Sequence, residues 1–222
     1  MRTAALIFDM DGTMVDSMPC HARSWVEFTR RRGISIDLPE LMARTTGRTG
    51  TECMRELFQR EIEAGEAKAL VAEKEAIYRA LFAPVFAEVA GFGAFWARAA
   101  ATGLKLAVGT AGDRHNIDFT FTRLALARVP DAVVGGDEGL AGKPDPAIFL
   151  AAAQRLGIAP ADCIVFEDAP LGIEAARRAG MRAVAICSSH EAAELSGPHV
   201  LAQARDFEQL KNQQFLESLH VA

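Results

Sequence analysis

The stretch Asp9-Met10-Asp11-Gly12-Thr13 directly follows a short apolar run, Ala4-Ala5-Leu6-Ile7-Phe8. An apolar run without polar alternation is typical of a strand that is buried on both faces of a parallel sheet. Because Gly12 permits a tight turn, we expect the carboxylates of Asp9 and Asp11 to approach one open site at the end of this strand. Two bare carboxylates about 4 Å apart repel each other by roughly 4 kcal/mol at an effective dielectric constant near 20. The pair therefore needs a bound cation or a trapped proton, and we expect a metal ion.

The same five residues also admit a purely structural interpretation, in which two aspartates cap a turn at the end of a strand. A calcium-binding EF-hand loop fits them poorly, because its pattern D-x-[DN]-x-[DN]-G places the glycine two residues later than Gly12. The stretch alone leaves the catalytic and the turn-capping interpretations open.

Composition limits the partners of the chain. It has 222 residues, half of them hydrophobic, which is enough to bury a full core, and its formal charge is -5 with a pI near 5.6. This charge gives no basic field for nucleic acid, so we expect no nucleic-acid partner. The four cysteines are far apart in sequence and indicate neither a zinc site nor a disulfide scaffold. The first apolar run is too short for a signal peptide and no long apolar span follows, so we expect a cytoplasmic protein without a membrane segment.

Four helical segments are predicted between the first strand and the rest of the chain. The first begins at Pro19 and ends at Arg30-Arg31-Arg32-Gly33, where basic residues precede a glycine. Thr49-Gly50-Thr51-Glu52 is typical of a capping box at the start of the third helix, and the fourth is expected over 66–82. Because no strand interrupts them, we predict an all-helical cap domain inserted at 16–84.

The rest of the chain alternates between short apolar runs and helical patterns. Strands are predicted at 104–108, 132–134, 163–166, 181–186 and 200–202, and helices at 92–101, 115–126, 146–156, 170–179 and 207–219. This spacing predicts an α/β fold with a doubly wound, parallel, Rossmann-like sheet. The catalytic core is expected to be discontinuous, comprising 1–15 and 85–222.

Polar residues follow three of the predicted strands. Asp9, Thr110 and the pair Glu167-Asp168 each come directly after a strand, and Lys143 lies in a loop that opens on the same side. Each feature alone is ordinary, since a lone lysine is usually solvated and a lone threonine usually caps a turn. Because parallel strands end at one edge of their sheet, we expect these residues to meet there.

These segments resemble, in order, the four motifs of the haloacid dehalogenase-like (HAD) superfamily. The motifs are the stretch at 9–13, then Gly109-Thr110-Ala111, Gly142-Lys143-Pro144 and Phe166-Glu167-Asp168. The resemblance covers nearly the whole chain and implies a Mg²⁺-dependent phosphohydrolase that forms an aspartyl-phosphate. Gly142-Lys143 is not a P-loop, because Pro144 replaces the required Ser or Thr.

The resemblance implies a role for each acid. Asp9 would attack phosphorus with one oxygen and bind Mg²⁺ with the other. Asp11 would protonate the leaving oxygen and later activate water, and its backbone carbonyl would also bind the metal. Asp168 would bind Mg²⁺ directly, and Glu167 directly or through water.

Three further residues would hold the transferring phosphoryl group. They are the Thr110 hydroxyl, the Ala111 amide and the Lys143 ammonium, which together would offset the charge of a dianionic substrate.

The segment 16–25 resembles that of the β-phosphoglucomutase-like group, including its His and Trp, and implies that the cap closes over the site and selects the leaving group. His21 would then lie near Asp11, although a polar histidine at a helix start is an equal alternative. Gly47 and Arg48 fall in the group's specificity loop, where Arg48 would contact a second anionic or hydroxyl-rich part of the substrate. Aligned through the cap, Ala80 stands where the mutase carries a lysine, which favours hydrolysis over phosphotransfer.

The sequence thus predicts a Mg²⁺-dependent phosphatase for a small phosphorylated metabolite such as a sugar phosphate, acting as a monomer or weak homodimer. A β-phosphoglucomutase-type activity is the alternative, and a non-catalytic phospholigand-binding protein is a third. Dehalogenation and phosphonate hydrolysis fit less well, because neither accounts for Asp11, whose proton suits an alkoxide leaving group.

Overall fold

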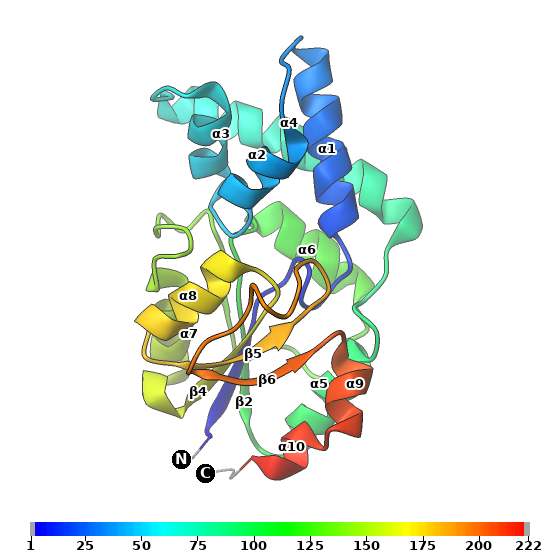
Figure 1. Cartoon of the computed structure of the whole chain (residues 1–222), viewed down its shortest axis with the longest axis vertical. Coiled ribbons are helices and arrows are strands. Elements are labelled where there is room, and N and C mark those ends of the chain that lie inside the picture. The colour runs from blue at the N-terminus through cyan, green and yellow to red at the C-terminus, as the bar shows by residue number, and fades with distance from the viewer. Residues whose placement is uncertain (1–2, 220–222) are drawn as a thin grey trace.

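A computed structural model of the chain describes residues 3–219, so the outermost ends of the expected core, 1–2 and 220–222, lie outside the described residues. A six-stranded parallel sheet in the order β3-β2-β1-β4-β5-β6 forms its centre. The strands are β1 (Ala5–Phe8), β2 (Lys105–Gly109), β3 (Ala132–Val134), β4 (Cys163–Glu167), β5 (Arg182–Ile186) and β6 (Val200–Ala204). Helices cover both faces of the sheet (Figure 1), which confirms the predicted doubly wound α/β class.

The two faces of the sheet bury separate apolar layers, because successive side chains of a strand point to opposite sides. Leu6 and Phe8 of β1 pack into the layer under α5 (Phe92–Ala101), α6 (Arg114–Arg123), α9 (Phe207–Asn212) and α10 (Phe215–Ser218). Ala5 and Ile7 pack into the layer under α7 (Ala147–Leu156) and α8 (Pro170–Arg178). The continuous apolar run of β1 is therefore explained by burial on both sides.

Four helices and a short 3₁₀ turn form the insertion between β1 and α5. They are α1 (Met18–Arg31), α2 (Leu38–Thr45), α3 (Gly50–Phe58), α4 (Ala64–Phe82) and η1 (Ala83–Val85). The four α-helices lie together above one edge of the sheet (Figure 1) and share an apolar cluster that includes Trp25, Phe28 and Met54. The predicted helical insertion is confirmed, and these four helices are called the cap helices below.

Several predicted helix boundaries differ from the structure. Helix α4 begins two residues earlier than predicted, because the Glu63 carboxylate accepts hydrogen bonds from the Gly65 and Glu66 amides at 2.8 and 3.2 Å. The single helix predicted at 207–219 is wrong, because Gln214 adopts a left-handed conformation (φ 54°) that separates α9 from α10. Among the described helices, none is long and apolar enough to cross a membrane.

Strand register sets the level of the residues that follow β1 and β4. Phe8 is paired with Val108 on one side and with Phe166 on the other, and the Asp9 amide donates to the Phe166 carbonyl at 3.0 Å. Asp9 and Glu167 therefore leave neighbouring strands at the same level of the sheet edge.

Helix α8 packs so closely on the end of β4 that only glycine fits at position 172. A Cβ atom there would lie 1.9 Å from the Glu167 carboxylate. Glu167 cannot move aside freely, because it accepts hydrogen bonds from Lys143 at 2.6 Å and from the Ala169 amide at 2.8 Å.

Gly172→Ala is expected to destabilise the fold by about 1–3 kcal/mol, the usual cost of overpacking, and to lower the Tm by roughly 3–10 °C in thermal unfolding. Gly65→Ala is the control, because its Cβ would approach only an oxygen at the end of the exposed Glu63 side chain, at 3.0 Å. Equal melting temperatures for the two variants would contradict the close packing at Gly172.

Candidate active site

A buried lysine joins two carboxylates at the carboxyl edge of the sheet. The Lys143 ammonium donates to Asp9 Oδ1 and, at 2.6 Å, to Glu167 Oε1, and it lies 4.9 Å from the centre of the Phe149 ring. Only 1% of the Lys143 side chain is exposed. Three segments distant in sequence, namely the ends of β1 and β4 and the loop before α7, therefore meet at one ion cluster.

The charges in this cluster do not balance. Burial raises the pKa of Asp9 to about 8, because the attraction of Lys143 offsets the effect only in part and Glu167 adds to it. Burial and the charge of Glu167 also raise the pKa of the neighbouring Asp168 well above its usual range. Burial lowers the pKa of Lys143, but the charges of Asp9 and Glu167 outweigh it and raise this pKa above its usual range. One ammonium would not offset the charge of all these acids if they were ionised, so the raised pKa values favour the protonated forms of Asp9 and Asp168 until a further cation binds.

The turn after β1 lies directly on the Asp168 carboxylate. Gly12 has a positive φ of 82°, and a Cβ atom on it would lie 2.1 Å from Asp168 Oδ2. The Thr13 hydroxyl donates to the other oxygen, Asp168 Oδ1, at 3.3 Å. Glycine is needed at position 12 for both the turn and this close approach.

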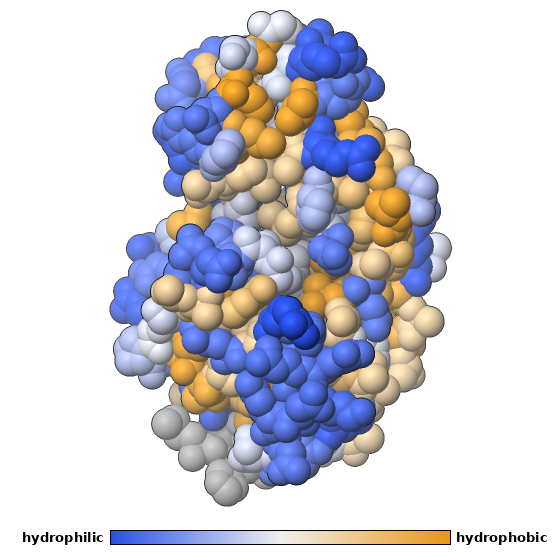
Figure 2. Space-filling view, turned by 45° about the vertical axis from the view of Figure 1, so that its right-hand side comes forward, coloured by the Kyte–Doolittle hydropathy of each residue, from blue (hydrophilic) through white to orange (hydrophobic). Residues whose placement is uncertain are grey.

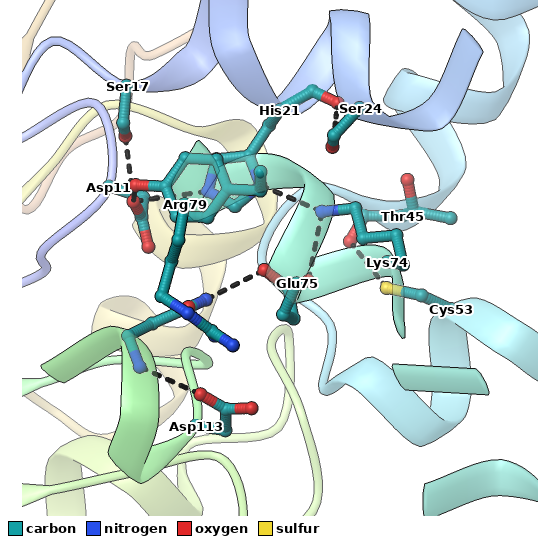
Figure 3. Close-up of polar contacts among 12 residues, drawn as sticks. Asp11, Ser17, His21, Ser24, Thr45, Cys53, Lys74, Glu75, Arg79 and Asp113 are labelled. Atoms are coloured by element: carbon teal, nitrogen blue, oxygen red, sulfur yellow. Dashed lines mark hydrogen bonds and ion pairs between the residues drawn. The ribbon is translucent and has the colours of Figure 1, made fainter. Parts of the chain in front are cut away.

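Asp11 faces the cap helices (Figure 3). Its Oδ1 accepts hydrogen bonds from the Ser17 hydroxyl at 2.7 Å and the Tyr78 hydroxyl at 3.0 Å, and His21 Nε2 lies 3.1 Å away. Burial alone would raise the pKa of Asp11, but the interactions with His21 and the two hydroxyls outweigh burial and lower it to about 2. Asp11 is therefore ionised at neutral pH.

A second buried lysine orients His21. Lys74 Nζ lies 2.9 Å from His21 Nδ1 and donates to Glu75 Oε1 at 2.9 Å. Because an ammonium group can only donate, Nδ1 must accept, and the ring proton resides on Nε2, which faces Asp11. The imidazole also stacks on Tyr78, with ring centres 3.7 Å apart.

Polar contacts join the cap helices to the core on two sides of this site. On one side, Asn116 of α6 donates to Glu75 and accepts from Arg79, both at 2.7 Å (Figure 3). On the other side, the Gly142 amide donates to Glu52 at 3.2 Å, and the Lys143 amide donates to the Gly47 carbonyl at 3.1 Å.

A cavity of about 1020 Å³ lies between the cap helices and the sheet edge. The outline of the molecule narrows at this level (Figure 2). All the residues selected from the sequence line this cavity: Asp9, Asp11, His21, Gly47, Arg48, Thr110, Ala111, Lys143, Glu167 and Asp168. The structure thus brings these residues together, while their chemical roles stay predictions.

Two details differ from the roles expected for single residues. The Thr110 hydroxyl accepts a hydrogen bond from the Gly112 amide at 3.0 Å and so shapes its own loop. The cap has a cation although position 80 is an alanine, because Lys74 is buried there and lines the cavity. The missing lysine at position 80 therefore does not distinguish hydrolysis from phosphotransfer.

Sequence reasoning missed Ser17, Lys74 and Tyr78 as parts of the site. The only signal for the last two is their spacing of four residues in a helical segment, which places them on one helix face. Ser17 directly precedes α1, and nothing in the sequence shows that its hydroxyl turns back to Asp11.

The acids at the sheet edge fit a hard divalent cation by their chemistry. All their donor atoms are carboxylate oxygens, which Mg²⁺ prefers, and a divalent cation would favour the ionised forms of Asp9 and Asp168, whose pKa values are raised without it. Within residues 3–219, no three carboxylate, imidazole or thiolate groups already converge as a metal-binding set. Asp9 and Glu167 are turned to Lys143, so binding a metal requires side chains to rotate.

Comparisons with known proteins agree with this geometry. The family model of the haloacid dehalogenase-like hydrolases matches residues 3–180. Fructose-1-phosphate phosphatase YqaB of Escherichia coli is 35% identical over 192 residues, which are 82% of this chain and 96% of that protein. The β-phosphoglucomutase of Bacillus subtilis is 30% identical over 189 residues, 82% of each chain. A hydrolase from Pseudomonas syringae superposes with a TM-score of 0.85 at 25% identity, over 98% of this chain and 100% of that structure.

The sequence match spans β1 to the end of α8 and so includes both carboxylate-bearing strand ends and Lys143. The chain therefore belongs to the haloacid dehalogenase-like hydrolases, in their β-phosphoglucomutase and sugar phosphatase group, and is a phosphatase of that family.

Proposed function

We propose that this phosphatase is Mg²⁺-dependent and cleaves a small sugar phosphate through an aspartyl-phosphate on Asp9. The observation that carries the proposal is the buried ion cluster of Lys143, Asp9 and Glu167 at the floor of a cavity that Asp11 also lines. The similarity to a fructose-1-phosphate phosphatase supports a sugar phosphate as the substrate.

In the first step, an Asp9 oxygen forms a bond to phosphorus, and the ester P–O bond breaks. Mg²⁺ held by Asp9, Glu167 and Asp168 would offset the negative charge of the phosphoryl group, which otherwise repels the attacking carboxylate. Lys143 and the loop at 110–111 orient the phosphoryl oxygens.

The leaving alkoxide needs a proton, and Asp11 is its source. Because Asp11 is ionised in the substrate-free protein, it must take up a proton before it can protonate the leaving oxygen. Asp11 then accepts a proton from the water that attacks the aspartyl-phosphate, which releases phosphate.

The insertion at 16–84 acts as a cap that selects the leaving group. Arg48 lines the cavity. Among the described residues, its buried Nε has no hydrogen-bond partner and its guanidinium has no carboxylate partner. We assign it to the sugar end of the substrate, where a guanidinium suits hydroxyl or anionic groups.

Phosphotransfer of the β-phosphoglucomutase kind is the alternative, and Lys74 is the cap cation that would favour it. Lys74 donates to His21 and Glu75, however, so its charge is already compensated within the chain. A mutase must bind a phosphate group at both ends of its intermediate, and this engagement therefore favours hydrolysis.

Asp9→Asn is expected to lower phosphate release from a sugar phosphate by at least about 1000-fold, because an amide is a poor nucleophile. The fold should persist, since the amide has nearly the same shape and Lys143 keeps Glu167 as its partner. Asp118→Asn, an exposed surface change on α6, is the matched control. Substantial activity in Asp9→Asn with unaltered circular dichroism would remove Asp9 as the nucleophile.

Mg²⁺ is expected to stabilise the chain, because it would bind acids that only the folded protein brings together. At a concentration about 100-fold above its Kd, a ligand adds about 2.7 kcal/mol, which corresponds to a Tm increase of roughly 5–10 °C for a domain of this size. Asp168→Asn should lose this increase and Asp118→Asn should retain it. An equal Tm increase in wild type and Asp168→Asn would exclude Asp168 as a metal ligand.

Arg48→Ala is expected to raise the KM for the preferred sugar phosphate about 10-fold, the effect of one charged hydrogen bond, with kcat changed little. Hydrolysis of p-nitrophenyl phosphate, which lacks a sugar, should be unaffected. Arg30→Ala, an exposed change in α1, is the control. The same assays should measure isomerised sugar phosphate as well as phosphate, because isomerisation with little free phosphate would favour the mutase.

A further inference from the structure

The loop after β5 reaches two separate parts of the site. Its residues Ser188, Ser189 and His190 follow the buried end of the strand. The mechanism proposed above gives them no role. Their polar contacts are all directed at Asp168 and at the turn after β1. This is the loop we call the serine clamp, defined by residues 188–190.

The clamp holds Asp168 at both its side chain and its backbone. The Ser189 hydroxyl donates to Asp168 Oδ2 and lies 3.2 Å from the Asp168 carbonyl. His190 Nδ1 lies 2.9 Å from the same carbonyl and 2.9 Å from Ser189 Oγ.

When Asp168 is ionised, as it would be with a cation bound, one arrangement of protons satisfies these contacts. A carbonyl oxygen can only accept, so His190 Nδ1 carries the proton and donates. The single Nδ1 hydrogen is then shared between the Asp168 carbonyl and the Ser189 oxygen, both 2.9 Å away, which leaves the Ser189 hydrogen for the Asp168 carboxylate. The chain of donors therefore runs from His190 through Ser189 to Asp168 and fixes the direction of each bond.

The clamp also holds the turn that carries the nucleophile motif. The Ser188 hydroxyl donates to the Gly12 carbonyl at 2.5 Å. Gly12 is the residue that lies against Asp168, and Thr13 of the same turn donates to Asp168 Oδ1. One loop thus fixes the turn and the acid against each other.

These contacts leave the carboxylate of Asp168 able to bind a cation. An ionised carboxylate offers about four lone-pair sites, and the hydroxyls of Ser189 and Thr13 occupy one site on each oxygen. Each oxygen keeps a free lone pair, but the side chain can no longer rotate freely. Hydrogen bonds of this kind to a metal-binding carboxylate typically change metal affinity by about 10–100-fold.

We propose that the serine clamp positions Asp168 as a ligand for the divalent cation, with Ser189 as the residue that fixes the orientation of its carboxylate. The proposal rests on the proposed Mg²⁺-dependent function. Ser188, Ser189 and His190 act here as positioning residues, because none of them needs to touch substrate or metal.

The test is the affinity of the substrate-free protein for Mg²⁺, measured by isothermal titration calorimetry. Ser189→Ala should raise the Kd about 10-fold, whereas kcat at saturating Mg²⁺ should stay within about 3-fold of wild type. Ser189→Thr, which keeps the hydroxyl, should restore most of the affinity. Ser196→Ala is the matched control, because Ser196 is exposed and its hydroxyl contacts only Ala193.

The Tm without Mg²⁺ separates positioning from a merely structural role. It should be nearly the same for wild type and Ser189→Ala, since the substitution removes one hydroxyl from a half-buried loop. Equal Kd values for Mg²⁺ in wild type and Ser189→Ala would contradict the positioning role of Ser189 without affecting the phosphatase proposal. A wild type that binds no Mg²⁺ would overturn the metal site and the clamp together.

Discussion

The site depends on the ion cluster that Lys143 forms with Asp9 and Glu167. Burying several carboxylates at one point is costly unless cations and hydrogen bonds compensate them, and a single ammonium compensates only part of their charge. The parallel register of β1 and β4 imposes this arrangement, because it places both acids at one level of one edge. The fold therefore imposes an electrostatic cost that a bound divalent cation would lower.

Close packing around the acids follows from the same constraint. Gly12 and Gly172 each lie where a Cβ atom would collide with a carboxylate, so the acids are held by backbone that approaches them directly. The second oxygen of Glu167 accepts a hydrogen bond from the nearby Ala169 amide, and the two oxygens of Asp168 accept from the Thr13 and Ser189 hydroxyls of other segments. The cap adds a separate layer around Asp11, so the two aspartates of one motif lie in different electrostatic surroundings and have opposite pKa shifts.

The sequence predicts those parts of the molecule that local pattern determines. The sheet, the helical insertion and the convergence of the acids all follow from short apolar runs that end in polar residues. The network around Asp11 does not follow, because Ser17, Lys74 and Tyr78 reach it only through the way the cap helices pack on the core. The separation of α9 from α10 at Gln214 could not be predicted either, since a left-handed conformation at a non-glycine residue depends on tertiary packing rather than on helix propensity.

The most direct test of the central claim, that Asp9 accepts the phosphoryl group, is chemical trapping of the acyl phosphate. Protein quenched during turnover with Mg²⁺ and a sugar phosphate is reduced with borohydride, which converts an aspartyl-phosphate to homoserine, and its peptides are analysed by mass spectrometry. The account predicts homoserine at position 9, absent without substrate and absent in Asp9→Asn. Steady release of phosphate with no modified residue, or with homoserine at another aspartate, would contradict it.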